Sequence, residues 1–218
     1  GIKITKTFTF GNSKYFSDLK INFKNVSEAP VTFNYKVAVG PSFPPRHSID
    51  EQYIEANFYS SVDSKNDLRH IKETKLGKTV ASHGALQWAA TKDRHFSVIL
   101  NPKTEGVSFA GVVEGLGNHK FGASLNSEKI ALAPGASVSS DFTLYLGPNE
   151  LDELEPAGLD MIVNFGKLDM IGRMLVGALE MIHKVFKNYG VSIIVLTALI
   201  NLVLFPLTRV SYMSMKRM

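Results

Sequence analysis

Apolar and polar residues alternate with a period of two from Ile2 to Leu146, the period of strands whose two faces meet different surroundings. The clearest case runs from Val31 to Val39, where every second residue is apolar and Thr32, Asn34 and Lys36 lie between. Many short strands separated by Gly and Pro, with no long helical pattern, predict an antiparallel sandwich over residues 1–158. The predicted strands lie at 2–10, 19–23, 31–39, 53–59, 87–90, 95–100, 107–113, 120–125, 129–132 and 138–146.

The period changes after the sandwich. An acidic turn or short helix is predicted at 149–156, and a connecting strand at 159–166. From 167 to 188 the apolar residues recur every three or four positions, which indicates a helix with one apolar stripe. This amphipathic helix is expected to lie in the headgroup plane of a membrane; alternatively it packs on the sandwich or on a partner protein.

Residues 189–207 contain no ionisable side chain except the Tyr189 phenol. At about 1.5 Å per residue the stretch is roughly 28 Å long, close to the ~30 Å hydrocarbon core of a bilayer. We therefore predict a transmembrane helix over 189–208, because a buried core helix would need a surrounding bundle. Thr197 and Asn201 lie four residues apart on one face, and the Asn amide needs partners that lipid does not offer. Pro206 is expected to mark a kink or the end of the span.

Charge is distributed unevenly along the chain, whose formal net charge is +4. No acidic residue follows Glu180, so the tail is basic and apolar, which suits anionic lipid better than nucleic acid. The basic residues beyond it are Lys184, Lys187, Arg209, Lys216 and Arg217. Their distribution slightly favours a cytoplasmic C-terminal end, with 209–218 as the start of a cytoplasmic region. Because the chain starts at Gly1 without an initiator Met and stops at Met218 just after a hydrophobic helix, we expect an internal fragment of a longer protein.

Signals of catalysis are weak. Zinc-protease, phosphate-loop, dinucleotide and serine-elbow motifs are missing from the sequence, Cys is absent, and the six histidines lack ligand spacing. We therefore expect neither an enzyme nor a metal or cofactor site. His83 and His95 flank Trp88, which suggests a sugar platform; the alternative is that Trp88 is a core or edge aromatic.

Several motifs resemble one known family. The run 188–218, with an aromatic-Gly-x-Ser-Ile-Ile entry and a Phe-Pro-Leu-Thr-Arg exit at 205–209, is similar to the second transmembrane segment of the YidC/Oxa/Alb insertases. Gln87-Trp88-Ala89 with Arg94-His95-Phe96, and the run 142–148, resemble the large periplasmic domain of Gram-negative YidC. The resemblance implies a galactose-mutarotase-like β-supersandwich, here truncated at its N-terminus and without sugar chemistry.

The resemblance also implies a location and a mechanism. The family resides in the bacterial inner membrane as a multi-pass protein, which places residues 1–188 in the periplasm. A hydrophilic intramembrane groove receives the polar part of an incoming segment; Thr197 aligns with the groove Thr, and Pro206 shapes its cytoplasmic end. Asn201 stands where the family carries its hallmark Arg, so the groove is neutral, the cation comes from elsewhere, or the protein is divergent.

The leading hypothesis is a membrane protein insertase and chaperone that acts alone or with the Sec translocon. Its expected partners are nascent membrane proteins, Sec translocon components and the lipid bilayer, but not nucleic acid. Arg209, Lys216 and Arg217 would form the cytoplasmic flank. The alternatives are a membrane-anchored carbohydrate-binding or sugar-modifying sandwich, and an envelope structural protein with a single anchor.

Overall fold

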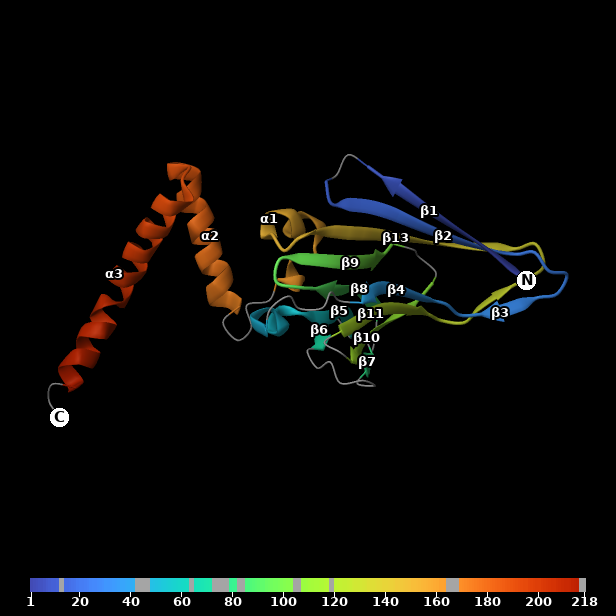
Figure 1. The fold of residues 1–218 in the computed structure, drawn as a ribbon, viewed down its shortest axis with the longest axis horizontal. Coiled ribbons are helices and arrows are strands. Elements are labelled where there is room, and N and C mark those ends of the chain that lie inside the picture. The colour runs from blue at the N-terminus through green and yellow to red at the C-terminus, as the bar shows by residue number, and fades with distance from the viewer. Residues whose placement is uncertain are drawn as a thin grey trace. The chain divides into compact units, whose positions relative to one another are not determined.

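The computed structural model describes residues 1–11, 14–41, 48–62, 65–71, 79–81, 85–103, 107–117, 120–163 and 169–215. Two compact units, Gly1–Val163 and Asn164–Met218, divide the chain, and each is described by itself. The first unit is built from antiparallel strands and the second from two helices (Figure 1). This confirms the predicted fold class, mainly antiparallel β followed by helices.

The strands of the first unit form three sheets, in which all pairs are antiparallel. The largest has the order β1-β2-β13-β9-β8-β5-β6, the second β4-β11-β10-β7, and the smallest β12-β3. Their bounds are β1 Ile2–Phe10, β2 Phe16–Asn25, β3 Val31–Phe33, β4 Lys36–Pro41, β5 Glu55–Val62, β6 Lys65–Ile71, β7 Thr79–Ala81, β8 Ala85–Lys92, β9 Phe96–Pro102, β10 Phe109–Gly117, β11 Lys120–Ser127, β12 Ile130–Leu132 and β13 Ser137–Pro148. A 3₁₀ helix, η1 (Ser48–Tyr53), precedes β5.

The main core lies between the two larger sheets, where alternate residues of their strands meet. It is rich in aromatic and branched side chains, including Phe58, Leu100, Phe121, Leu125 and Phe142, all nearly inaccessible to water. Burial of this kind, at about 25 cal/mol per Å² of apolar surface, is the main stabilising contribution to the sandwich. Here the period of two in the sequence translates directly into buried and exposed faces.

One sequence expectation about this part of the chain is corrected. The predicted strand 31–39 is broken at Asn34 and Tyr35, because β3 pairs with β12 whereas β4 pairs with β11. The alternation continues through the break, so periodicity alone gave no sign of the change of sheet. In β1, by contrast, the alternating apolar residues Ile4, Phe8 and Phe10 remain half or more exposed. β1 is an edge strand, next only to β2.

The segment after β13 is not a strand. It consists of a short helix, α1 (Leu151–Leu154), and two 3₁₀ turns, η2 (Glu155–Ala157) and η3 (Asp160–Ile162). The predicted connecting strand at 159–166 is therefore wrong for residues 159–163, and its remaining residues lie outside the described ones. Gly158 adopts a left-handed φ of 68°, and it closes η2 and turns the chain back. Because η2 and η3 both turn the chain, no extended stretch remains here that could pair as a β-strand.

The second unit is a hairpin of two helices, α2 (Asp169–Phe186) and α3 (Tyr189–Met215) (Figure 1). α2 coincides with the predicted amphipathic segment. α3 is longer than the predicted span, because it continues through Pro206 to Met215. Pro206 therefore does not end the helix, whereas the apolar stretch that could span a membrane, Tyr189–Pro206, ends at this residue.

Candidate functional site

α3 is the one helix among the described residues that is long and apolar enough to cross a membrane, over Tyr189–Pro206. Almost none of that stretch is buried by the rest of the chain. Its large apolar side chains point outward, and Ile194, Leu202 and Val203 are each at least 70% exposed. In water such a surface would be costly, at about 0.8 kcal/mol per CH₂ group. The helix therefore requires a non-aqueous or protein environment.

Two polar side chains interrupt this surface on one face. Thr197 donates its hydroxyl hydrogen to the Ile193 carbonyl at 2.7 Å, so its polarity is satisfied within the helix. Asn201 lies one turn later and is exposed, and no other described residue forms a hydrogen bond with its amide. An Asn amide has two donor hydrogens and an acceptor oxygen. Asn201 therefore presents unused hydrogen-bonding capacity at the position where the sequence predicted a groove residue.

The corner between the helices is tightly built. Asn188 caps α3, since its side-chain oxygen accepts a hydrogen bond from the Val191 N–H at 3.2 Å. Ser192 is fully buried, and its hydroxyl donates to the Asn188 carbonyl at 2.8 Å. Lys187, with a left-handed φ of 52°, reverses the chain between the helices. The side-chain oxygens of Asn188 and Ser192 are thereby both hydrogen-bonded within the first turn of α3.

Ring stacking adds to the corner. The His183 and Tyr189 rings lie nearly parallel, with centroids 3.8 Å apart and an interplanar angle of 12°. His183 belongs to the last turn of α2 and Tyr189 to the first turn of α3, so the stack joins the two helices directly. This contact restricts the angle at which α2 leaves α3.

α2 leaves part of its apolar surface uncovered. Met170, Met174, Met181 and Val185 share one face and are each at least 65% exposed. Lys184 is exposed too, away from the centre of this face. The arrangement is that of a helix with one side available to an apolar phase and basic groups near its end.

The residues expected at the cytoplasmic flank are only partly described. Arg209 is exposed on the last turns of α3, whereas Lys216 and Arg217 lie outside the described residues. Pro206 is exposed and lies inside the helix, three residues before Arg209. The structure thus places Thr197, Asn201, Pro206 and Arg209 on one continuous helix.

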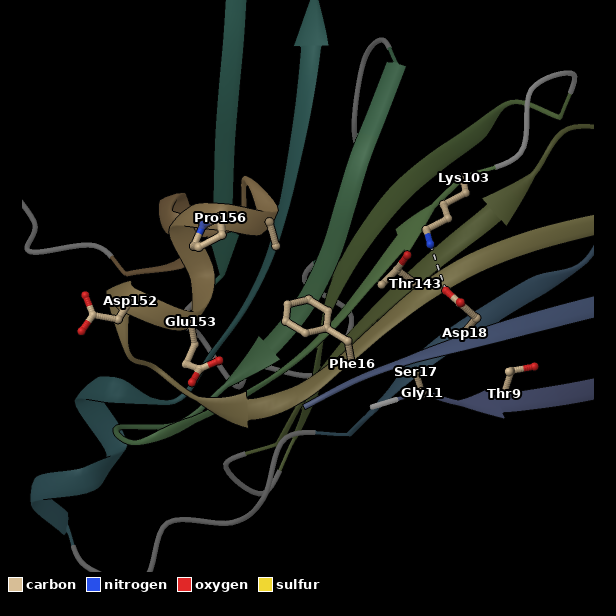
Figure 2. A pocket seen from close by; sticks show the side chains of 11 residues that line it. Thr9, Gly11, Phe16, Ser17, Asp18, Lys103, Thr143, Asp152, Glu153 and Pro156 are labelled. Atoms are coloured by element: carbon tan, nitrogen blue, oxygen red, sulfur yellow. Dashed lines mark hydrogen bonds and ion pairs between the residues drawn. The ribbon is translucent and has the colours of Figure 1, made fainter. Parts of the chain in front are cut away.

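A cleft of about 520 Å³ lies on the sandwich, between the β1–β2 hairpin, β13 and the α1–η2 segment (Figure 2). Lys103 pairs with Asp18 at 2.9 Å in its wall, while Asp152 and Glu153 border it from α1. Its described lining offers the hydroxyls of Ser17 and Thr143 among others, but no histidine that could activate them. Among the described residues no cluster of three His, Asp or Glu side chains could hold a metal ion.

Trp88 cannot be a sugar platform. Its side chain is 1% exposed and stacks on Tyr59, with ring centroids 5.6 Å apart. His95 is exposed on a turn instead, and His83 lies outside the described residues. The core interpretation of Trp88 is confirmed, and the carbohydrate hypothesis loses the residue on which it rested.

The second core cluster, to which Trp88 belongs, lies on the other face of the large sheet. Residues 149–163, called the cap segment below, cover this face with Leu154, Leu159 and Ile162, all at most 2% exposed. Tyr145 is completely buried there, and its hydroxyl donates to the Pro148 carbonyl at 2.6 Å. Burial, together with the nearby carboxylate of Glu153, raises the pKa of Tyr145 to about 12.

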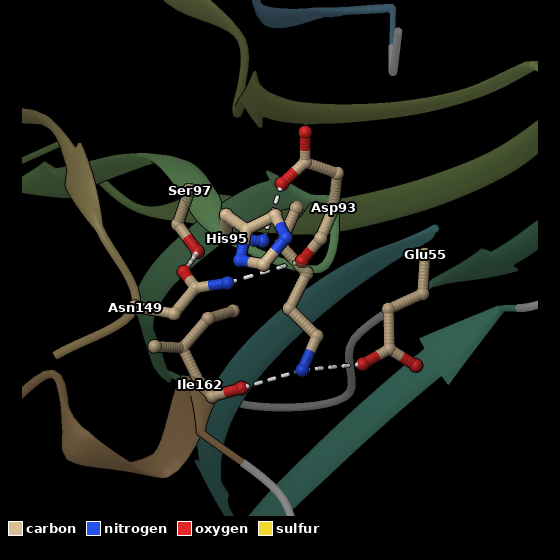
Figure 3. Close-up of polar contacts among 7 residues, drawn as sticks. Glu55, Asp93, His95, Ser97, Asn149 and Ile162 are labelled. Atoms are coloured by element: carbon tan, nitrogen blue, oxygen red, sulfur yellow. Dashed lines mark hydrogen bonds and ion pairs between the residues drawn. The ribbon is translucent and has the colours of Figure 1, made fainter. Parts of the chain in front are cut away.

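Sequence reasoning missed a buried ion pair beside the cap segment. Lys92 Nζ lies 2.7 Å from the Glu55 carboxylate, and both side chains are nearly inaccessible (Figure 3). The two residues face each other across β5 and β8. The sequence did contain a signal that Lys92 is buried. Lys92 follows Trp88 and Ala90 at a spacing of two, which puts all three side chains on one face of a strand.

Comparisons with known proteins agree on one family. The family model for the YidC periplasmic domain matches residues 1–178. Similar curated proteins include the membrane protein insertase YidC of Cupriavidus taiwanensis, 31% identical, of Aromatoleum aromaticum, 33% identical, and of Geobacter sulfurreducens, 27% identical. Each alignment covers all of this chain, which spans about two fifths of the length of those relatives.

Among solved structures, a putative aldose 1-epimerase from Escherichia coli K12 matches with a TM-score of 0.44 and 12% identity. That match covers 67% of this chain and 60% of the other.

Proposed function

This chain belongs to the YidC family, and from that premise we propose that the protein inserts and folds other integral membrane proteins. The observation that carries the proposal is α3, an exposed apolar helix with two polar side chains, Thr197 and Asn201, on one face. Relatives that are insertases align over the whole chain, so α3 lies within the shared region. No covalent chemistry is required by this function.

The proposed mechanism is a hydrophilic groove that lowers the cost of moving polar groups through hydrocarbon. A charged residue at the bilayer centre costs about 2.5–3.5 kcal/mol on insertion scales. Water held beside Thr197 and Asn201 would shorten the dry path that such a group must cross. Asn201 supplies donors and an acceptor but no fixed charge, so the groove wall contributed by α3 is neutral. The attraction of acidic client segments by this wall is correspondingly weak.

The proposed topology follows from the charges and the two helices. Residues 1–188 lie in the periplasm, α3 crosses the bacterial inner membrane as one span of a multi-pass protein, and the segment from Arg209 onward enters the cytoplasm. Lys216 and Arg217 add to the positive flank. α2 lies in the headgroup region with its methionine-rich face toward the acyl chains, and it braces the span through the corner at Asn188.

The proposed partners are nascent membrane proteins, the surrounding lipid and, for some clients, components of the Sec translocon. The sandwich, 1–158 in the proposed division, would contact the translocon or stiffen the assembly. These assignments rest on the family and on the exposed helical surfaces. Client cross-linking from Asn201, compared with cells depleted of Sec components, separates direct insertion from Sec-dependent insertion.

Depletion and complementation test the proposal. Cells are depleted of the full-length protein, and insertion of small coat-protein-like clients is followed by protease protection. We expect insertion to fail on depletion and to return with the wild-type gene. Normal insertion in depleted cells that contain no second homologue would refute the insertase assignment.

A further inference from the structure

We propose that Lys92 is a positioning residue, which fastens the end of the sandwich to the large sheet and thereby limits the free chain between the sandwich and the helical hairpin. Lys92 Nζ donates to the Ile162 carbonyl at 2.7 Å and also contacts the Glu55 carboxylate at 2.7 Å (Figure 3). These three groups are called the latch. Its docking role stands on the structure alone, while its effect on insertion rests on the proposed function.

The latch is buried, which makes it strong and specific. The side chains of Lys92 and Glu55 are 11% and 6% exposed, so water competes little for the ammonium group. Glu55 neutralises the lysine and orients it, because the two residues are direct cross-strand partners. The remaining hydrogen-bonding capacity of the ammonium is then directed at a backbone carbonyl of η3. A buried charge that bonds a backbone carbonyl far along the chain ties two distant segments together.

Polar contacts also fix the start of the cap segment. The Asn149 amide nitrogen donates to the Asp93 carbonyl at 3.0 Å, and the Ser97 hydroxyl donates to the Asn149 side-chain oxygen (Figure 3). The Asn149 backbone N–H donates to the His95 carbonyl at 2.8 Å. The cap segment is thus held at Asn149 by the β8–β9 turn, at Ile162 by the latch, and between them by Leu154 and Leu159.

The latch matters because it lies just before the short connection to α2. Only residues 164–168 separate the first unit from Asp169, the first residue of α2. A connection of this length spans at most about 20 Å when fully extended. Release of the cap segment back to Pro148 would lengthen the possible reach to about 70 Å. The latch therefore sets whether the sandwich is closely or loosely tethered to the hairpin that carries α3.

Hydrogen exchange on the full-length protein tests the docking. The amides of Leu159, Ile162 and Val163 bond within the cap segment and report its undocking. Lys92→Met is expected to speed their exchange by roughly tenfold to a hundredfold, the range for loss of a hydrogen bond to a charged group. Lys20→Met is the matched control, because Lys20 pairs with Asp141 on the same sheet but is half exposed.

A second variant distinguishes loss of the latch from general misfolding. Lys92→Met leaves Glu55 buried opposite a neutral residue, whereas Lys92→Met with Glu55→Leu replaces the pair by apolar groups. The double variant is expected to keep the exchange protection of β9 and β13 while the cap segment still exchanges fast. Unchanged protection of the cap segment in the double variant, or equal loss over the whole sheet, would overturn the latch.

Insertion assays in proteoliposomes test the positioning role. We expect the double variant to insert a coat-protein-like client two- to tenfold more slowly, with an unchanged unfolding temperature and with Lys20→Met at the wild-type rate. Fast exchange of the cap segment together with wild-type insertion would overturn the positioning role. Wild-type protein that inserts nothing would instead refute the proposed function, and the exchange pattern would then decide the latch by itself.

Discussion

Two arginine substitutions at nearly the same depth of α3 separate a wet face from a lipid face. Leu199 and Asn201 are two residues apart, so they differ by about 3 Å in depth but by about 200° around the helix. Both are exposed in the structure, Leu199 at 49%. Both also lie near the middle of the Tyr189–Pro206 stretch, where a charge is most expensive in hydrocarbon.

The magnitude follows from insertion energies. An arginine at the helix centre costs about 2.5–3.5 kcal/mol, and removal of a leucine forfeits about 0.3–0.6 kcal/mol, so Leu199→Arg costs about 3–4 kcal/mol. The apolar side chains of the span together contribute only about 3–7 kcal/mol on the same scale. Leu199→Arg should therefore remove half or more of the driving force for insertion of α3. Asn201→Arg should cost far less, because water in the groove would solvate the guanidinium.

The assay uses the full-length protein. Protease protection of the sandwich reports insertion of α3, and complementation of depleted cells reports activity. We expect Leu199→Arg to reduce both, and Asn201→Arg to preserve both and to favour clients with acidic tails. Leu199→Asn is the neutral control for loss of the leucine. Equal losses for the two arginine variants would refute the assignment of Asn201 to a wet face.

Three further predictions concern stability. Because burial raises the pKa of Tyr145 to about 12 from its usual 10, the folded state holds the phenol proton more tightly than the unfolded state, and this stabilisation is fully present below pH 10 and lost as pH rises through 12. The urea midpoint should therefore fall over that window, and Tyr145→Phe should flatten the fall. Gly111→Ala places a Cβ 2.6 Å from Leu86 Cδ1 and should lower the free energy of unfolding by about 1–3 kcal/mol, measured by denaturant titration; an unchanged midpoint would contradict the packing argument. Asn188→Ala removes the cap from the Val191 N–H and should destabilise α3 by about 1 kcal/mol, seen as faster amide exchange in its first turn, whereas unchanged exchange there would mean that the cap is not formed.

The sequence was most informative about secondary structure where the local pattern of apolar residues directly reflects which side chains are buried. Alternation located most strands because a sheet with one buried face enforces a period of two, and the stripe of α2 followed for the same reason at the helical period. The exposed span was evident from composition, since few soluble environments tolerate such a stretch. Thr197 and Asn201 stand out in the sequence because they are polar residues within an apolar stretch, and their role in a groove stays a prediction.

Pairings between distant segments could not be read in this way. Nothing local distinguishes Asn34 and Tyr35 as the place where the chain changes sheets, since the alternation continues across them. The cap segment looked like a strand at 159–166, but Gly158 turns it, and the outer face of the large sheet holds it with Leu154 and Ile162. The residues next to Trp88 in the sequence do not indicate whether its side chain is buried or exposed.

The sequence by itself determined that most of the first 146 residues form strands, that α2 is amphipathic and that α3 is an apolar stretch, because hydrophobic periodicity and local composition act over a few residues. Only the tertiary structure decided that Trp88 is buried, that β1 remains exposed at an edge, and that Lys92 meets Glu55 and the carbonyl of Ile162. These outcomes depend on contacts between residues far apart in the chain. Burial and the strength of a charge pair are properties of those contacts, since the dielectric surroundings of a side chain are set by whatever folds over it.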